Sequence, residues 1–319
     1  PNLVCLRASV KRLNHEDPVE LAGYLHEQVA NTNDVPLCSP GQRIDSDAVQ
    51  GIECITTDTD IHIAVVQCQN VIESDSEIAI ELFAIAGTMP LSEARDRAEA
   101  ACARGFAKCA TAHDKAYRKE RRAACVEFDG SPSTVQGFNF GQMHMHMALS
   151  PIAEQTGIPI KGLTGHGYRF LTFWDMDFHM FGYYLMTKPE RARKLLEYRY
   201  NQLPAYRENA KRWGAKGAQV PWETNTRGLE ETAPWLCLQE REIHISADAA
   251  YMFMRYADIT GDESVIRDMG AEFAFETARF YTSRLRWNDA QSRYELPDIG
   301  CPDQYHTFAD NNVFISLMA

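Results

Sequence analysis

The sequence has no uninterrupted apolar run of eighteen residues, which is about the length that a membrane-spanning helix needs. Its first twenty residues also lack the basic-then-apolar pattern of a secretory signal. Basic residues are the minority, because 32 Lys and Arg stand against 44 Asp and Glu for a net charge of −12. Nucleic-acid phosphates attract basic surfaces, so this balance argues against a nucleic-acid partner. We therefore expect neither a membrane nor a nucleic-acid partner, and a cytoplasmic protein.

Cysteine motifs are missing as well. The nine cysteines are scattered, and no two of them have C-x-x-C spacing. Without that spacing, neither a zinc site nor a disulfide framework is indicated, and free thiols in a reducing compartment are expected. The run Met143–Met147 contains two His two positions apart, which on a helix point in different directions. Core packing is therefore favoured there, and no metal is predicted.

The amino-terminal part has the composition of β-structure. The whole chain, with 319 residues, 45% hydrophobic and 24% charged, is long enough for two domains or one large one. Ile61–Val66 and Glu77–Ile85 are β-branched, apolar runs of strand length with polar breakers between them. The stretch Val35–Val49 has the character of a loop. Residues 1–88 are predicted to be β-rich.

The pattern changes to helical after Pro90. Ser92 is predicted to cap a helix that ends at Gly105, and a second helix is expected over Ala112–Cys125. Later, a helix is expected to open at Thr187, and another, whose apolar face runs to Ile259, ends before Gly261. Asp262 is predicted to cap the next one. Residues 89–136 are read as a helical linker.

Helices of 10–20 residues with short connections predict a bundle, solenoid or α/α-barrel for residues 137–319. No fixed-period repeat is present, which disfavours a solenoid. Polar loops between the helices favour a barrel with its site at one rim. The last residues, Asn312–Ala319, are still within a pattern, so we expect a fragment that holds the first part of the barrel.

Four stretches concentrate Trp, carboxylates, Gly and His beyond what packing needs. They are Lys161–Tyr168 with Phe173–Asp177, Gly217–Glu223, Glu242–Asp248, and Gly300–His306 with Ala309–Asn312. Two of them contain a Trp followed by an acid, Trp174-Asp175 and Trp222-Glu223. An indole face stacks on a pyranose ring while carboxylates accept hydrogen bonds from its hydroxyls. A sugar site is one interpretation, and core packing with helix capping is the other.

The same stretches resemble glycoside hydrolase family 65, the family of inverting maltose, trehalose, kojibiose and nigerose phosphorylases and of some hydrolases. The resemblance is close over residues 138–319 and looser before them. The motifs that carry it are KGLTGHGY, FWDMDFHM, GAKGAQVPWE, EIHISADAAY and CPDQYHTFADNN. It implies a mainly α fold: an (α/α)6 barrel, partial in this chain, preceded by the helical linker and the end of an amino-terminal β-sandwich.

The resemblance also implies roles for individual residues. Trp174 and Asp175 match residues that hold the non-reducing glucose, and Trp222 with Glu223 matches a second wall of that site. His244 lies in a stretch that matches the substrate-facing rim. Tyr305, next to the catalytic position, matches a substrate-binding residue. A homodimer is implied in the same way.

Residue 304 departs from the family pattern, because relatives have Glu as the general acid where this chain has Gln304. An amide cannot release a proton near neutral pH, and losing a general acid costs about two to four powers of ten in rate. Gln is close to Glu in size, so substrate binding is expected to survive. Both an engineered substrate trap and a natural Gln account for the residue. Relatives also have other residues at five further positions, His166, Met176, Asp177, Cys301 and Thr307. We expect three of these, His166, Met176 and Thr307, to determine which acceptor is selected.

The leading hypothesis is an inverting α-glucoside phosphorylase. Inorganic phosphate is the co-substrate, no cofactor is needed, and β-glucose 1-phosphate and the free acceptor are the products. A hydrolase of the same family and a non-catalytic sugar-binding or subunit protein are the alternatives. An unrelated α/α-barrel protein is a third alternative. It is disfavoured because this sequence lacks the metal-binding residue sets that such proteins use. The phosphate site, or the base of a hydrolase, is expected beyond residue 319, so the sequence leaves phosphorylase and hydrolase open.

Overall fold

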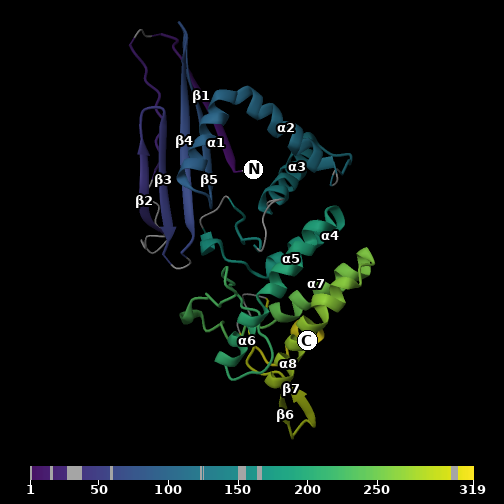
Figure 1. The fold of residues 1–319 in the computed structure, drawn as a ribbon. Helices are drawn as coiled ribbons and strands as arrows, with labels where there is room; N and C mark the ends of the chain where they lie inside the picture. The colour runs from purple at the N-terminus through teal and green to yellow at the C-terminus, as the bar shows by residue number, and fades with distance from the viewer. Residues whose placement is uncertain are drawn as a thin grey trace. The chain divides into compact units, whose positions relative to one another are not determined.

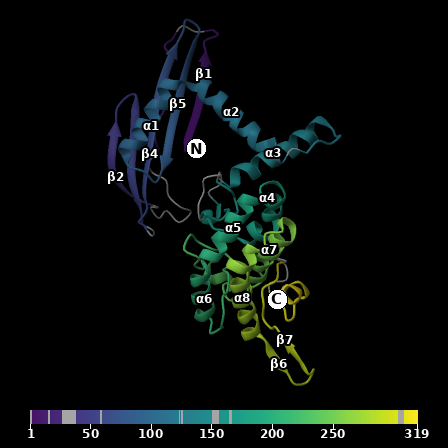
Figure 2. The ribbon, with the colours of Figure 1, turned by 45° about the vertical axis from the view of Figure 1, so that its right-hand side comes forward.

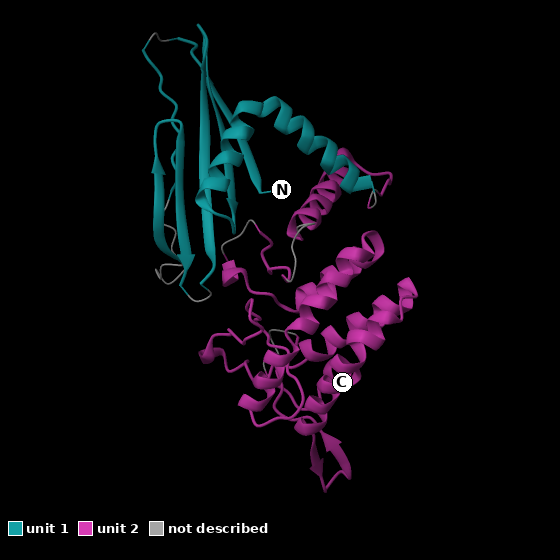
Figure 3. Cartoon of the chain, in the orientation of Figure 1, with its two compact units in different colours: residues 1–122 teal, residues 123–319 magenta. Residues whose placement is uncertain are grey.

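The computed structural model describes residues 2–14, 17–26, 38–57, 60–122, 124, 126–149, 156–163, 167–302 and 308–319. The chain divides into two compact units, residues 1–122 and residues 123–319 (Figure 3). The first unit consists of an antiparallel sheet and two helices, and the second is mainly helical. In the described part of the chain, no helix is long and apolar enough to cross a membrane.

The sheet of the first unit has five strands in the order β1-β5-β4-β3-β2. Their bounds are β1 Leu3–Lys11, β2 Cys38–Asp45, β3 Val49–Thr56, β4 His62–Glu73 and β5 Glu77–Gly87. The predicted strands Ile61–Val66 and Glu77–Ile85 correspond to β4 and β5, but β4 begins at His62 and continues seven residues past the predicted end. The loop-like stretch 35–49 instead contains β2, whose side chains are mostly exposed, so it lacks the apolar alternation that would have revealed it.

One face of the sheet is covered by α1 (Leu91–Arg104), which contacts β3, β4 and β5 (Figure 1). Phe83 is fully buried between the sheet and the small side chains of α1, such as Ala94 and Ala98. On β1, Val4 and Leu6 are exposed. The described residues of this unit form a single sheet, so the β-sandwich stays a prediction.

Two helix starts in this unit differ from the prediction. Helix α1 begins at Leu91 after Pro90, so Ser92 lies in its first turn and does not cap it, whereas Gly105 ends it as expected with φ 82°. Helix α2 (Phe106–Arg122) begins six residues before the predicted start. Gly105 alone separates the two helices, so α2 begins directly after it and no loop precedes the predicted start.

The second unit is built from helices whose bounds are α3 Pro132–Ala148, α4 Phe181–Thr187, α5 Pro189–Asn201, α6 Leu203–Arg212, α7 Ile245–Thr260, α8 Ala271–Arg284 and α9 Val313–Met318. Shorter turns are η1 Gly167–Phe170, η2 Asp175–Met180, η3 Pro234–Leu236 and η4 Ile266–Gly270, and a hairpin is formed by β6 Arg286–Asn288 and β7 Arg293–Glu295. Helix α7 contacts α4, α5 and α8 (Figures 1 and 2). The described helices do not establish a closed (α/α)6 barrel, which stays a prediction.

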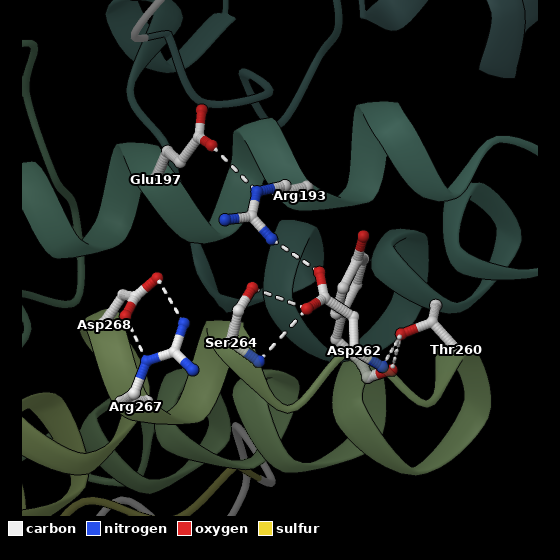
Figure 4. Close-up of polar contacts among 8 residues, drawn as sticks. Arg193, Glu197, Thr260, Asp262, Ser264, Arg267 and Asp268 are labelled. Atoms are coloured by element: carbon white, nitrogen blue, oxygen red, sulfur yellow. Dashed lines mark hydrogen bonds and ion pairs between the residues drawn. The ribbon is translucent and has the colours of Figure 1, made fainter.

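The connection from α7 to α8 is fixed by polar contacts (Figure 4). Gly261 ends α7 in the left-handed region with φ 72°, and Asp262 accepts a hydrogen bond from the Ser264 backbone N–H at 3.1 Å, as predicted for a cap. The other carboxylate oxygen of Asp262 accepts from Arg193 Nη1 on α5 at 2.7 Å. The capping group of one helix thus also holds a neighbouring helix.

In helix α3, His144 is exposed and His146 is buried, so the two imidazoles lie on different faces, as the spacing predicted. A search of the described residues for groups of three or more His, Cys, Asp or Glu suited to a metal ion finds none.

Candidate functional site

Two segments that are far apart in the sequence meet through their backbones. Thr172 and Thr224 exchange both backbone hydrogen bonds at 2.9 Å, as an antiparallel pair does. Next to this isolated bridge, the Phe173 ring lies edge-on to the Trp222 indole, with the ring centroids 5.6 Å apart. The bridge and this contact bring the segments that carry the two Trp-acid pairs together.

The segment that leads to Trp222 is pinned to three helices in succession. The Ala218 N–H donates to Glu276 O of α8 at 2.9 Å, and the Gln219 N–H donates to Tyr206 O of α6 at 2.9 Å. The Val220 N–H donates to Ser246 Oγ of α7 at 3.0 Å. All three residues are buried, so these bonds satisfy donors that would otherwise be stranded. The position of Trp222 is therefore set by the helical core.

The imidazole of His244 contacts both indoles. Its ring centroid lies 4.8 Å from that of Trp174, at an interplanar angle of 85°, and 5.6 Å from that of Trp222, at 68°. Both Trp side chains are half-buried, whereas His244 is fully buried. Three of the predicted site residues thus meet, and His244 is fully buried against both indoles and not on an exposed rim.

Two carboxyl groups lie near the imidazole of this aromatic cluster. His244 Nδ1 lies 2.6 Å from Asp248 Oδ2, one turn along the start of α7, because residues four apart share a helix face. On the other side, His244 Nε2 lies 3.9 Å from Glu242 Oε1. Burial raises the pKa of Glu242 to about 8, so this carboxyl is mainly protonated at neutral pH.

Glu223 lies in a different electrostatic environment. Burial, followed by the nearby carboxylate of Glu230, raises its pKa to about 7, while the guanidinium of Arg169 opposes the shift. Arg169 Nη2 is 3.9 Å from Glu223 Oε2. Glu230 accepts the backbone N–H groups of Trp222 at 2.9 Å and of Glu223 at 3.3 Å, so it fixes the backbone of both predicted site residues.

Asp175 is half-buried at the first position of η2. Two residues on, Asp177 is buried and forms an ion pair with Arg199 of α5, which donates to it from both Nε, at 2.8 Å, and Nη2. Arg199 also donates to Thr224 Oγ1 at 3.2 Å. This pair therefore ties the turn that carries Trp174 to the bridge that orients Trp222.

Gln304 and Tyr305, together with His166 and Thr307, lie outside the described residues. The residues on either side of 303–307 are held in place: Ile299 and Ala309 form a backbone bridge, and the Gly300 N–H donates to Arg241 O at 2.8 Å. A Cβ on Gly300 would lie 1.8 Å from Glu242 Oε2. The base of this segment thus packs on Glu242, two residues from His244.

Met176 is one of the three residues where acceptor selectivity is expected. Its side chain is buried in the main core of the unit, where its sulfur accepts from the Ile158 N–H at 3.4 Å. A buried side chain offers no surface to an acceptor, and the expected role of Met176 in acceptor selectivity stays a prediction.

The sequence reasoning also missed Arg169, Asp177, Arg199, Glu230, Glu242 and Asp248 as supporting residues. A signal existed for Arg199, which falls at helical spacing from Leu195 and Leu196, because a charge on a buried face needs a partner. Asp248 similarly precedes Met252 on the buried face of α7. No comparable signal marks Arg169 or Glu230, which become relevant only through loop contacts.

Comparisons with known proteins identify the family of this chain. The family model described as the glycosyl hydrolase family 65 central catalytic domain matches residues 139–319. A kojibiose phosphorylase from Caldanaerobacter subterraneus subsp. tengcongensis is 34% identical over 226 residues, which are 68% of this chain and 29% of that protein. An α,α-trehalose phosphorylase from Thermoanaerobacter brockii is 37% identical over 203 residues, which are 61% of this chain and 25% of that protein.

A solved structure from the human microbiome, assigned as a kojibiose phosphorylase, has the same fold with a TM-score of 0.78. It is 21% identical, and the match covers 91% of this chain and 42% of that one. The chain spans less than a third of the length of the two curated relatives above. Because the family model matches more than half of its residues, the chain belongs to glycosyl hydrolase family 65.

Proposed function

We propose that this chain is the glucosyl-binding part of an inverting α-glucosyl-disaccharide phosphorylase whose acid position is occupied by Gln304. The observation that carries the proposal is the meeting of Trp174 and Trp222 around His244, each indole being followed in sequence by an acid. Half-buried indoles provide apolar surface for the faces of a pyranose, and Asp175 and Glu223 provide acceptors for its hydroxyls.

The chemistry follows from the acid position. With Glu at 304, the carboxylic acid would protonate the leaving glycosidic oxygen while inorganic phosphate attacks the anomeric carbon from the opposite face. Inversion then yields β-glucose 1-phosphate and the free acceptor. Relatives named kojibiose, α,α-trehalose and nigerose phosphorylases support phosphate as the co-substrate. Gln304 leaves the proton transfer without a donor, so slow turnover of a bound substrate is expected.

The test is Gln304→Glu in the full-length protein, assayed with kojibiose, nigerose, maltose and trehalose in the presence and absence of phosphate. We expect phosphate-dependent release of β-glucose 1-phosphate from at least one disaccharide to rise by about a hundredfold or more. Gln291→Glu, at an exposed position in the turn between β6 and β7, is the matched control and should change nothing.

Two other outcomes would contradict the proposal of a phosphorylase. Release of free glucose at the same rate without phosphate would identify a hydrolase. No turnover of any of the four disaccharides would favour the non-catalytic sugar-binding protein, a reading that Gln304 itself suggests. In that case Trp174→Ala and Trp222→Ala should still abolish sugar binding, whereas Trp235→Ala, at a side chain that is 82% exposed, should leave it intact. A homodimer and a cytoplasmic location stay predictions.

A further inference from the structure

Three buried polar side chains lie next to one another, and the middle one contacts both indoles. Glu242 is 4% exposed, and His244 and Asp248 are 0% exposed. Burying such groups costs free energy unless they are paired, so three of them buried together need an explanation. Their location next to Trp174 and Trp222 suggests that they orient the two indoles.

The hydrogen bond between His244 and Asp248 fixes the orientation of the imidazole. With Asp248 ionised, its carboxylate can only accept, so at 2.6 Å from Asp248 Oδ2 it is Nδ1 of His244 that carries the hydrogen. The opposite nitrogen, Nε2, points toward Glu242 and has no hydrogen-bond partner among the described residues. Among the described residues, the hydrogen bond to Asp248 is therefore the polar contact that distinguishes one orientation of the ring from its flipped orientation.

The orientation of this ring matters because His244 is the side chain, among the described residues, whose ring contacts both indoles. Its edge-on contacts, at 85° to Trp174 and 68° to Trp222, are directional and change if the ring rotates. Phe314 of α9 contacts the same ring at 5.9 Å. Trp174 and Trp222 come from loops almost fifty residues apart, so the imidazole serves as the spacer between the two walls.

We propose that Asp248 is a positioning residue: through its hydrogen bond to His244, it holds Trp174 and Trp222 at the spacing that admits a glucosyl ring. The proposal rests on the proposed function, because it assigns the two indoles to the sugar. His244 is fully buried and acts through the indoles, so neither His244 nor Asp248 touches the sugar. The role is one of orientation and requires no proton transfer.

The experiment compares Asp248→Asn with Asp248→Leu. Asn keeps an oxygen that accepts from Nδ1, whereas Leu has a similar volume and no acceptor. Binding of unhydrolysed disaccharide to the Gln304 protein is measured by titration calorimetry. We expect Asp248→Leu to weaken binding by about tenfold or more and Asp248→Asn to stay within about threefold of the parent. The exposed Asp258 of α7 provides the control pair, Asp258→Asn and Asp258→Leu, with no change expected.

A second readout does not depend on sugar binding. Trp213, Trp235 and Trp287 are replaced by Phe, and acrylamide quenching then reports on Trp174 and Trp222. Proton NMR follows the Nδ1–H signal, expected far downfield in the parent and in Asp248→Asn and absent in Asp248→Leu. His244→Phe, which keeps a ring without nitrogens, replaces Asp248→Leu if that variant does not fold.

The outcomes separate the two proposals. If the parent binds none of the disaccharides, the proposed function fails. The quenching data alone then test whether Asp248 positions the two indoles. If the parent binds sugar and Asp248→Leu binds it equally well with unchanged quenching, Asp248 does not position the walls. If Asp248→Asn is as damaging as Asp248→Leu, the charge and not the orientation is what matters, and the positioning proposal is overturned.

Discussion

Glu242 shows how one buried carboxyl links the pH to stability. Its pKa is raised from 4.5 to about 8 because burial penalises the charged form. Between these two values the folded protein keeps a proton on Glu242 that the unfolded chain has lost. The stability that the protonated Glu242 carboxyl contributes is complete below about pH 4.5 and is lost as the pH rises through about 8.

We predict that the free energy of unfolding of the parent falls with rising pH, relative to that of Glu242→Gln, by roughly 1.4 kcal/mol per pH unit between about pH 5 and 8. The Gln side chain has no proton to lose, so the difference between the two proteins isolates this carboxyl from Glu223 and other groups. Urea denaturation at several pH values measures it. Glu240→Gln, two residues away and only partly buried, is the control. Parallel pH curves for the parent and Glu242→Gln would contradict the prediction.

At the scale of elements, the loop between α6 and the Trp222 segment depends on two glycines with different constraints. Gly214 and Gly217 both have positive φ, at 72° and 75°. A Cβ on Gly214 would meet nothing within 4 Å, whereas on Gly217 it would lie 2.1 Å from Glu276 O and 2.6 Å from Phe280 N of α8. The second glycine is thus required by close packing as well as by backbone conformation.

We predict that Gly214→Ala costs about 1–2 kcal/mol of unfolding free energy, from the left-handed backbone alone. Gly217→Ala should cost roughly 3 kcal/mol or more, because the loop must also move away from α8. Thermal or urea denaturation gives both values. Gly217→Ala should in addition shift the fluorescence of Trp222, whose segment begins at this contact. Equal costs for the two variants would show that the packing against α8 is not tight.

At the scale of the whole molecule, each compact unit has a hydrophobic cluster formed from its own residues. Phe83 belongs to the cluster of residues 1–122, and Leu195 and Phe253 belong to that of residues 123–319. The buried Asp177–Arg199 ion pair also lies entirely within the second unit. Domains with separate cores commonly unfold as separate cooperative units.

We therefore predict two calorimetric transitions. Asp177→Ala should lower the midpoint of only one of them, with a loss of about 3–5 kcal/mol, because it leaves the Arg199 charge buried and unpaired. Phe83→Ala should lower only the other, by a similar amount. Asp268→Ala, which removes the surface partner of Arg267 seen in Figure 4, should shift neither transition measurably. A single transition that moves with both core variants would contradict independent unfolding.

Much of the local structure could be predicted from the sequence. The strands within β4 and β5, the ends of α1 and α7 at glycines and the capping by Asp262 follow from periodicity and from residues close in sequence. The whole of β2 was missed because its side chains are mostly polar and exposed, and the start of α2 was missed because it follows Gly105 with no loop in between. The two Trp-acid pairs were identified as site candidates, but the sequence could not show that His244 is buried between the indoles.

The sequence by itself determined the family, the helical character of residues 139–319 and the Gln at 304, because these depend on residue identity and on short-range spacing. Only the tertiary structure decided that Trp174, Trp222 and His244 meet, that Asp177 is paired with Arg199 and that Glu242 holds a proton near neutral pH. These properties arise from contacts between distant segments and from the removal of water around them. The spacing of residues along one helix or strand predicts neither the contacts nor the burial.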